Sequence, residues 1–211
     1  MNTERNFEYG YYADCLKECT QKFGSLHDLP IMYGQNKKIA ELYQGGNVLD
    51  IGAGKEKPLQ KNLHLSDEVY YSLDNDRSGA FHYRSIEDIP SSHIFSLIIA
   101  SQFFEHLTLQ ESIHVVCNLY PHLEEGGYFI STVPNIAHPI RQRTNIDHVT
   151  SWEYKALYTL YAYGGFDVLE ILRFSKRHPR GIIEKTLANY INAIYRVDWC
   201  DSIMLIGCKR E

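Results

Sequence analysis

Two acids and two glycines at the ends of the first predicted strands have the types and spacing of a ligand-binding turn. The segment NVLDIGAGKEKP, residues 47–58, leads from an apolar strand into Asp50 and then into the tight turn of Gly52, Ala53 and Gly54. The next predicted strand closes in SLDND, with Asp74 directly after it. Glycine permits backbone conformations that bring the main chain close to a ligand. The turn therefore indicates a nucleotide-like ligand.

Two familiar phosphate-binding loops do not match this turn. A Walker loop needs a glycine, four residues and then Gly-Lys-Ser/Thr, but Gly54-Lys55 is followed by Glu56 and preceded five positions earlier by Leu49. A dinucleotide fingerprint needs a third glycine three residues after the second, and that position is Lys57. The carboxylate of Glu56 would also repel a pyrophosphate. The first interpretation fails and the second is weak.

A nucleoside that carries a positive charge instead of a phosphate fits the turn better. Asp74 would accept hydrogen bonds from both ribose hydroxyls, while Asp50 and nearby carbonyl groups would favour the cationic part. Other roles stay open. Asp50 could only cap the turn through its backbone amides, and Asp76 could replace Asp74 or cap the next helix. Gly52 and Gly54, taken alone, could be ordinary turn glycines.

Several further motifs follow in a fixed order, and together they resemble those of the class I S-adenosylmethionine-dependent methyltransferases. VLDIGAG is similar to the first motif of that family, SLDND to its second-strand acid and SIEDIP to its adenine-side turn. FSLIIASQFFEHL is similar to its fourth strand and LEEGGYFISTVPN to its fifth. DHVTSWEYKALYTLYAYGGFDVLEI is similar to the late helix and strand of the small-molecule branch called type 11. The resemblance covers roughly residues 35–175 and the last strand.

The resemblance implies S-adenosylmethionine as cofactor and methyl transfer to a small-molecule acceptor, such as an acidic or sugar-like hydroxyl compound, with oxygen slightly favoured over nitrogen. It places the cofactor against Asp50, Gly52, Ala53, Gly54, Asp74, Asn75, Ser85, Ile86, Ser101 and Gln102. Glu56 stands where the family often has a third glycine, and Ser85 where it often has an aspartate that contacts adenine. A non-catalytic cofactor-binding or scaffold protein is the alternative, and a nucleotide-dependent oxidoreductase is a third.

The implied reaction is a displacement at the methyl carbon, which needs alignment more than it needs an acid or a base. A hydroxyl acceptor would still benefit from a base that removes its proton. His106 and His148 are the catalytic candidates, and His138 also lies just past a strand end. Packing or helix-start roles are the favoured alternative for His106 and His148. No metal site is predicted, because Cys15 and Cys19 could share a helix face but lack a second pair of ligands.

Alternating strands and helices are expected to position these residues. Helices are predicted at 11–23 and 35–44, and after Thr108 and Thr150, each followed by a glutamate at the capping-box spacing. Pro121 should kink or end the helix after Thr108 early. Apolar runs predict strands at 47–51, 69–73, 80–83, 95–100, 128–133, 166–174 and 202–208.

This alternation predicts an α/β fold with a doubly wound, mostly parallel sheet and helices on both faces. The resemblance makes the sheet seven-stranded and Rossmann-like, with an antiparallel last strand. A single domain over 1–211 is expected, with a helical cap at 1–46, a cofactor-binding core at 47–175, an inserted segment at 176–200 and the last strand at 201–211. The helix expected at 181–196 could pack on the sheet, cover the pocket or pair with a second subunit in a homodimer.

Charge and motif both argue against a nucleic-acid substrate. The formal net charge is −5 and the pI is about 6.1, whereas a general nucleic-acid binder has a basic surplus. In related families, methylation of adenine or amide nitrogens uses an Asn-Pro-Pro-aromatic box after the fourth strand, where this chain has Ser101, Gln102, Phe103 and Phe104. Cytosine C5 methylation needs a Pro-Cys nucleophile at that place, and no cysteine is there. An anionic small molecule is favoured by the loop residues Arg141, Arg143, Lys176, Arg177 and Arg180, although a solvated surface is the more ordinary role for them.

The same composition bears on location. The N-terminus is polar and no run of about 18 apolar residues occurs, so neither a secretory signal nor a membrane segment is expected. The five cysteines form no paired metal-binding motifs and are interpreted as free thiols of a reducing compartment. We therefore expect a cytoplasmic protein with no membrane partner.

Overall fold

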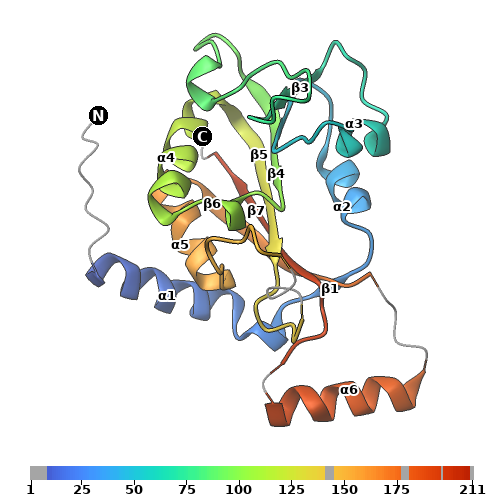
Figure 1. Cartoon of the computed structure of the whole chain (residues 1–211). Coiled ribbons are helices and arrows are strands. Elements are labelled where there is room, and N and C mark those ends of the chain that lie inside the picture. The colour runs from blue at the N-terminus through green and yellow to red at the C-terminus, as the bar shows by residue number, and fades with distance from the viewer. Residues whose placement is uncertain (1–8, 141–144, 177–180, 196, 210–211) are drawn as a thin grey trace.

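The computed structural model describes residues 9–140, 145–176, 181–195 and 197–209. Its helices and strands alternate along the chain (Figure 1). In chain order they are α1 (Tyr9–Phe23), β1 (Ile31–Met32), α2 (Gln35–Leu42), β2 (Val48–Ile51), α3 (Pro58–Leu63), β3 (Tyr70–Leu73), β4 (Phe95–Ser101), α4 (Leu109–Leu119), β5 (Leu123–Pro134), α5 (Tyr154–Gly164), β6 (Asp167–Phe174), α6 (Ile182–Tyr195) and β7 (Ser202–Cys208).

All seven strands form one sheet in the order β1-β6-β7-β5-β4-β2-β3. β7 runs antiparallel to both of its neighbours, β5 and β6, and the other pairs are parallel. The predicted doubly wound sheet and its antiparallel last strand are therefore confirmed. The carboxyl ends of β2, β3 and β4 lie side by side, so the loops that follow them meet at one edge of the sheet.

One predicted strand is wrong and one strand was missed. Residues 80–83 make only an isolated bridge between Tyr83 and Leu73, because the amides of both His82 and Tyr83 bond to the same carbonyl of Ser72. The seventh strand is instead the two-residue β1, which pairs with the end of β6 at the opposite edge of the sheet. Two residues are too short to show a periodic pattern in the sequence.

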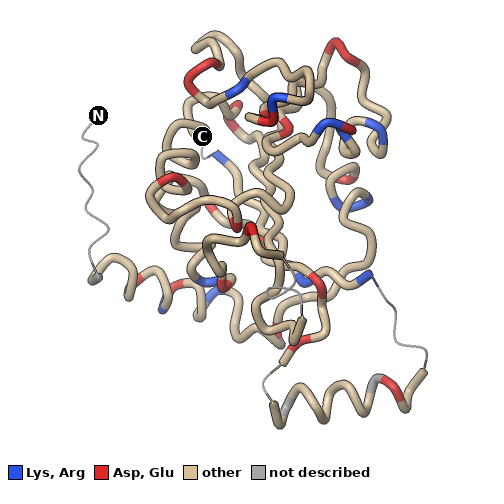
Figure 2. The backbone as a smooth tube through the Cα atoms, in the orientation of Figure 1, with Lys and Arg blue, Asp and Glu red and all other residues tan. Residues whose placement is uncertain are grey.

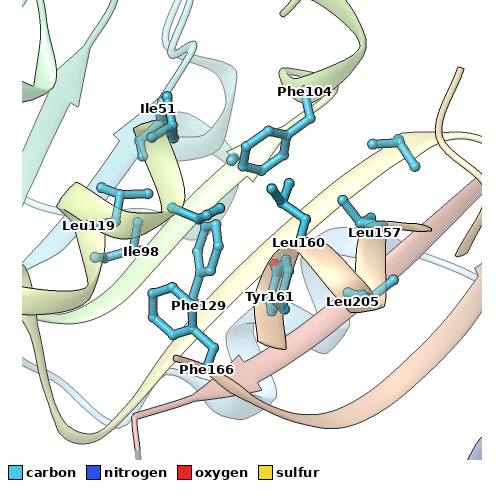
Figure 3. Close-up of a cluster of buried hydrophobic side chains, with 14 of the residues drawn as sticks. Ile51, Ile98, Phe104, Leu119, Phe129, Leu157, Leu160, Tyr161, Phe166 and Leu205 are labelled. Carbon is cyan, nitrogen blue, oxygen red and sulfur yellow. The ribbon is translucent and has the colours of Figure 1, made fainter. Parts of the chain in front are cut away.

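Two hydrophobic cores cover the two faces of the sheet, because successive side chains of a strand point to opposite sides. In β4, Ile98 and Ala100 pack in the core that includes residues of α1, α4 and α5, while Leu97 and Ile99 pack against α2 and α3. Figure 1 shows these two groups of helices on opposite sides of the sheet. Figure 3 shows part of the larger core, whose rings and aliphatic side chains come from both the sheet and the helices.

One of the two predicted capping boxes forms. The Thr108 hydroxyl accepts a bond from the Glu111 amide, and the Glu111 carboxylate accepts one from the Thr108 amide at 2.8 Å, so α4 begins as expected. The prediction for Thr150 is wrong: α5 begins at Tyr154 with Glu153 as its N-cap. The Thr150 hydroxyl instead donates to the Leu107 carbonyl at 2.6 Å. α4 ends at Leu119, just before Pro121.

α6 lies at one end of the molecule, apart from the helices that flank the sheet (Figure 1). Its apolar side chains Ile183, Leu187, Tyr190 and Ile194 recur at helical spacing and are 53–85% exposed. Basic positions are scattered among acidic ones along the described backbone (Figure 2). Among the described helices, none combines the length and the apolar character that a membrane crossing needs.

Candidate functional site

The glycine turn after β2 is held against the end of β3. The amides of Gly52 and Ala53 both donate to the Leu73 carbonyl, at 2.9 and 3.3 Å. Gly52 and Gly54 have φ values of 69° and 63°, which L side chains rarely adopt, so both positions favour glycine. A Cβ atom at Gly54 would meet no other atom within 4 Å, so the turn is open on that side.

Asp74 closes β3 and faces this turn. Its Oδ2 atom accepts the Gly54 amide at 2.8 Å, and its Oδ1 atom accepts the Asp76 amide at 2.9 Å. The side chain is half-buried, and each carboxylate oxygen can accept a further bond. Asp76 has a different place: its carboxylate caps the following turn through the amide and hydroxyl of Ser78. The structure thus brings Asp74, and not Asp76, into contact with the glycine turn.

Asp50 lies inside β2 and is buried, with 3% of its surface exposed. Its carboxylate accepts a bond from the Tyr70 hydroxyl at 2.6 Å, so it is held by a side chain of β3. Burial raises the pKa of Asp50 to about 7, and the nearby carboxylate of Asp74 acts in the same direction. The site thus contains a buried acid whose ionisation is costly unless a positive charge lies beside it.

The two departures from the family pattern have defined places. The side chain of Glu56 points away from the turn, since it is 80% exposed and pairs with Lys61 at 3.1 Å. Ser85 precedes the short 3₁₀ helix Ile86–Asp88, and its amide donates to the Asp88 carboxylate at 2.9 Å. The side chain of Ile86 packs in the larger core, so a ligand contact from this residue would come from its backbone.

The end of β4 adds a polar cluster that links three elements. Ser101 lies 3.1 Å from the Thr132 hydroxyl of β5 and accepts a bond from Gln35 of α2 at 2.8 Å. Gln102 has a φ of 52°, and its amide donates to the Thr132 carbonyl at 2.9 Å. Gln35 was not among the residues predicted from the sequence, because its place beside β4 depends on how α2 packs.

Phe103 connects the end of β4 with the glycine turn. A Cβ atom at Gly52 would lie only 2.9 Å from the Phe103 ring, so the absence of a side chain at Gly52 is what makes room for that ring. Asn75, which follows Asp74, is exposed. The predicted residues around Asp50, Gly54 and Asp74 are therefore brought together, while Ser85 belongs to a neighbouring turn.

The two predicted catalytic histidines also lie together. The ring centroids of His106 and His148 are 5.2 Å apart and nearly perpendicular. Glu105 joins them: one carboxylate oxygen of Glu105 and one ring nitrogen from each histidine lie within 4.8 Å of one another. Glu105 was not among the residues predicted from the sequence, although it stands directly before His106.

Backbone bonds hold this cluster in place. The Glu105 carbonyl accepts the amides of Val149 and Thr150, at 2.8 and 3.1 Å. The indole of Trp152 donates to the Phe104 carbonyl at 2.9 Å. Hydrogen bonds therefore hold the segment before α5 against the short 3₁₀ helix Phe104–His106, which follows β4.

A cavity of about 1000 Å³ also lies at the carboxyl ends of the strands, but far from β2 and β3. It is lined by residues of α6 and by residues at the ends of β1 and β6. Its lining includes His138, the third histidine considered above. Arg173 also lines the cavity, but its side chain is buried. Its guanidinium donates hydrogen bonds to Asp198 at 3.2 Å and to two backbone carbonyls. Of the expected basic rim, only Lys176 is described, and Arg141, Arg143, Arg177 and Arg180 lie outside the described residues.

Comparisons with known proteins agree with this fold. No protein-family profile and no curated protein sequence matches the chain. Among solved structures, a SAM-dependent methyltransferase from Archaeoglobus fulgidus is 16% identical, with a TM-score of 0.62 over 96% of this chain and 100% of that one. The N-methyltransferase NodS from Bradyrhizobium japonicum is 13% identical, with a TM-score of 0.53 over all of both chains.

A third solved structure shows that this fold serves more than one reaction. The [4+2]-cyclase SpnF is 15% identical, with a TM-score of 0.58 over 83% of this chain and 79% of that one. At such low identities the likeness establishes the architecture. The chain therefore has the Rossmann-like fold of the class I methyltransferases, and its activity has to be argued from its own site.

Proposed function

We propose that the chain is an S-adenosylmethionine-dependent methyltransferase that acts on a small-molecule acceptor. The observation that carries this proposal is the 2.8 Å bond from the Gly54 amide to Asp74, which joins a glycine turn and an acid at adjacent strand ends. Ligands of doubly wound sheets bind in the crevice beyond such ends. Two of the structures with this fold are described as methyltransferases, which supports the same chemistry here.

The charges of the turn favour a cationic nucleoside over a phosphate. Asp50 is buried beside Tyr70 and near Asp74, and burial keeps its pKa near 7. A positive charge in the crevice would offset the cost of ionising Asp50, whereas a phosphate would increase it. When bound, the cofactor supplies a methyl group on a positively charged sulfur, and that charge suits these two acids.

Each predicted contact residue has a proposed role. The remaining lone pairs of Asp74 accept the ribose hydroxyls. Gly52 and Ala53 hold the turn against β3, and the open side at Gly54 lets the backbone come close to the cofactor. Asn75 flanks the ribose, and Ser85 with the amide of Ile86 serves the adenine. Ser101 and Gln102 line the methionine end, where Gln35 already bonds to Ser101.

The acceptor is proposed to be an acidic or sugar-like hydroxyl compound. His106 and His148 are adjacent, and His106 is exposed, so a base is available for the hydroxyl proton. An oxygen nucleophile needs this base more than an amine does. The large cavity under α6 is a poorer acceptor site, because β1 and β6 lie at the opposite side of the sheet from β2 and β3.

The test is calorimetric titration with S-adenosylmethionine, its demethylated product and a nicotinamide dinucleotide. We expect micromolar binding of the first two and none of the third. Asp74→Ala should abolish binding, whereas the matched control Asp76→Ala removes an exposed acid two residues away and should keep it. Unchanged affinity in Asp74→Ala would refute the assignment of the ribose acid.

A non-catalytic role for the same fold is the alternative. It is favoured by one observation: the Phe103 ring occupies the space over Gly52. If that ring stays in place, part of the turn is closed to a ligand. If neither the cofactor nor its product binds in the titration, this alternative is supported. Binding without turnover of any acceptor would support a cofactor-binding scaffold.

We further propose that the protein is a cytoplasmic homodimer that pairs through α6. The exposed apolar stripe of α6 would be buried by a second copy, and large apolar patches commonly mark such surfaces. The five cysteines, all within the described residues, form no disulfide, which suits a reducing compartment. Leu187→Glu should convert the dimer to a monomer in light scattering, while Ile94→Glu, at an exposed apolar residue elsewhere, should not.

A further inference from the structure

The cluster of Glu105, His106 and His148 contains an unusual acid. Glu105 is 1% exposed, and neither carboxylate oxygen has a hydrogen-bond partner among the described residues. A buried carboxylate without partners is costly, and proteins retain such groups where a positive charge or a metal ion compensates them. Burial alone raises the pKa of Glu105 to about 7.

The cluster differs from a hydrogen-bonded pair of an acid and a histidine. Neither Glu105 oxygen hydrogen-bonds to either imidazole, although a carboxylate oxygen and both ring nitrogens lie within 4.8 Å of one another. One oxygen of Glu105 and one nitrogen of each histidine therefore form a close group of three possible metal ligands. A cation placed among them could bind all three after a small movement of the side chains.

The histidine geometry fits a ligand role as well. The Nδ1 atom of His106 lies 3.3 Å from the Asp147 carbonyl, which can only accept a hydrogen bond. A hydrogen bond to this oxygen requires a proton on Nδ1, and in the neutral imidazole this leaves the lone pair of Nε2 available to a metal ion. A backbone carbonyl that fixes the tautomer in this way is a common feature of metal-binding histidines.

We propose that Glu105, His106 and His148 bind a divalent metal cation of the Zn²⁺ type. Two imidazoles and one carboxylate form a ligand set that suits such ions and leaves at least one coordination position open. Tetrahedral ligands at about 2.1 Å from the ion are roughly 3.4 Å apart, so the donor atoms would move together by up to about 1.4 Å. Exposed His106 and half-buried His148 have room for this movement.

The open position has a consequence that rests on the proposed methyltransferase function. A hydroxyl bound to a divalent cation loses its proton more easily. Glu105 and His106 lie in the short 3₁₀ helix that follows β4, and the ring of the preceding Phe103 lies beside Gly52, so the cation would sit near the proposed cofactor turn. The cation would then ease loss of the acceptor's hydroxyl proton to solvent, while the oxygen takes the methyl group and the bond from that group to the cofactor sulfur breaks. In this form of the reaction, His106 and His148 would hold the cation, and this ligand role replaces the base role given to them under the proposed function.

The test measures metal binding alone, without cofactor or acceptor. Untagged protein is stripped with a chelator and titrated with Zn²⁺ by calorimetry, and with Co²⁺ by visible absorption, which distinguishes nitrogen and oxygen ligands from thiolates. We expect one equivalent to bind. Glu105→Gln and His148→Gln should each weaken binding by at least about tenfold, since each removes a ligand.

His114→Gln is the matched control, because His114 also contacts a carboxylate, Glu87, but is exposed and lies outside the cluster. Its affinity should equal that of the wild type. Absence of binding, a Co²⁺ spectrum of thiolate type, or equal affinity in Glu105→Gln and the wild type would overturn the proposal. Circular dichroism of each variant shows whether it folds. Cofactor binding is measured separately, so failure of the metal site and failure of the methyltransferase assignment give different results.

Discussion

The buried acid of the glycine turn should make the stability of the protein depend on pH. The pKa of Asp50 rises from 3.8 to about 7 on folding, mainly through burial. The folded protein therefore keeps a proton that the unfolded chain releases as the pH rises above about 4. The free energy of unfolding should fall between pH 4 and pH 7, and the rise in pKa corresponds to a loss of up to about 4 kcal/mol.

Asp50→Asn isolates this contribution. Asparagine keeps the shape of the side chain and an oxygen that accepts the Tyr70 hydroxyl, but it cannot ionise. Urea unfolding from pH 4 to pH 8 should show the variant gaining up to about 4 kcal/mol relative to the wild type as the pH rises. Glu105, whose pKa is also raised, is common to both proteins and cancels in the difference.

Tyr70→Phe provides the complementary change. It removes the hydrogen bond that lowers the pKa of Asp50, so that pKa should rise further in the folded protein. The fall in unfolding free energy with pH should then be larger and should continue to a higher pH than in the wild type. Parallel stability curves for the wild type and Asp50→Asn would refute the reasoning, because they would mean that Asp50 ionises as easily in the folded protein as in the unfolded chain.

Three further substitutions test the fold around the site by urea unfolding. Gly52→Ala and Gly54→Ala both place a side chain at positive φ, which should each cost about 1–2 kcal/mol of unfolding free energy. Only the new methyl group at position 52 also meets the Phe103 ring, so Gly52→Ala should destabilise more, and equal effects would contradict that contact. Thr108→Ala removes the α4 cap and should cost about 1 kcal/mol, and no loss would mean that the capping box is not formed in solution. Arg173→Leu leaves a buried aspartate without its cation and should cost about 3–5 kcal/mol, while a value below 1 kcal/mol would show that water replaces the pair.

The sequence predicted those parts of the fold that have strong local signals. The long apolar runs around β4 and β5 and the Thr108–Glu111 cap produced the expected strands and helix start. The predicted edge strands of the sheet were wrong: a strand was predicted at 80–83, and β1 was missed. β1 has only two residues and depends on pairing with β6 for its conformation. Thr150 matched a capping pattern, but its hydroxyl bonds to Leu107, 43 positions away, and tertiary contact overrode the local signal.

The glycine turn was predictable because its chemistry is local. Gly52 and Gly54 follow Asp50 within four residues, and a closing acid at the end of the next parallel strand must lie close by. What the sequence could not show is the partner of each acid. Asp50 bonds to Tyr70 because both are on the same face of neighbouring strands, which depends on the register of β2 with β3.

The Glu105 cluster was only half predictable, and the reason lies in how it is assembled. His106 and His148 were recognised as separate candidates, but their meeting depends on bonds from the amides of Val149 and Thr150 to the Glu105 carbonyl. The same bonds hold the 3₁₀ helix whose fold buries the Glu105 side chain. A glutamate before a histidine looks like an ordinary exposed pair in a sequence. Its burial, which turns it from a surface charge into a candidate ligand, arises only when the segment before α5 packs across the end of β4.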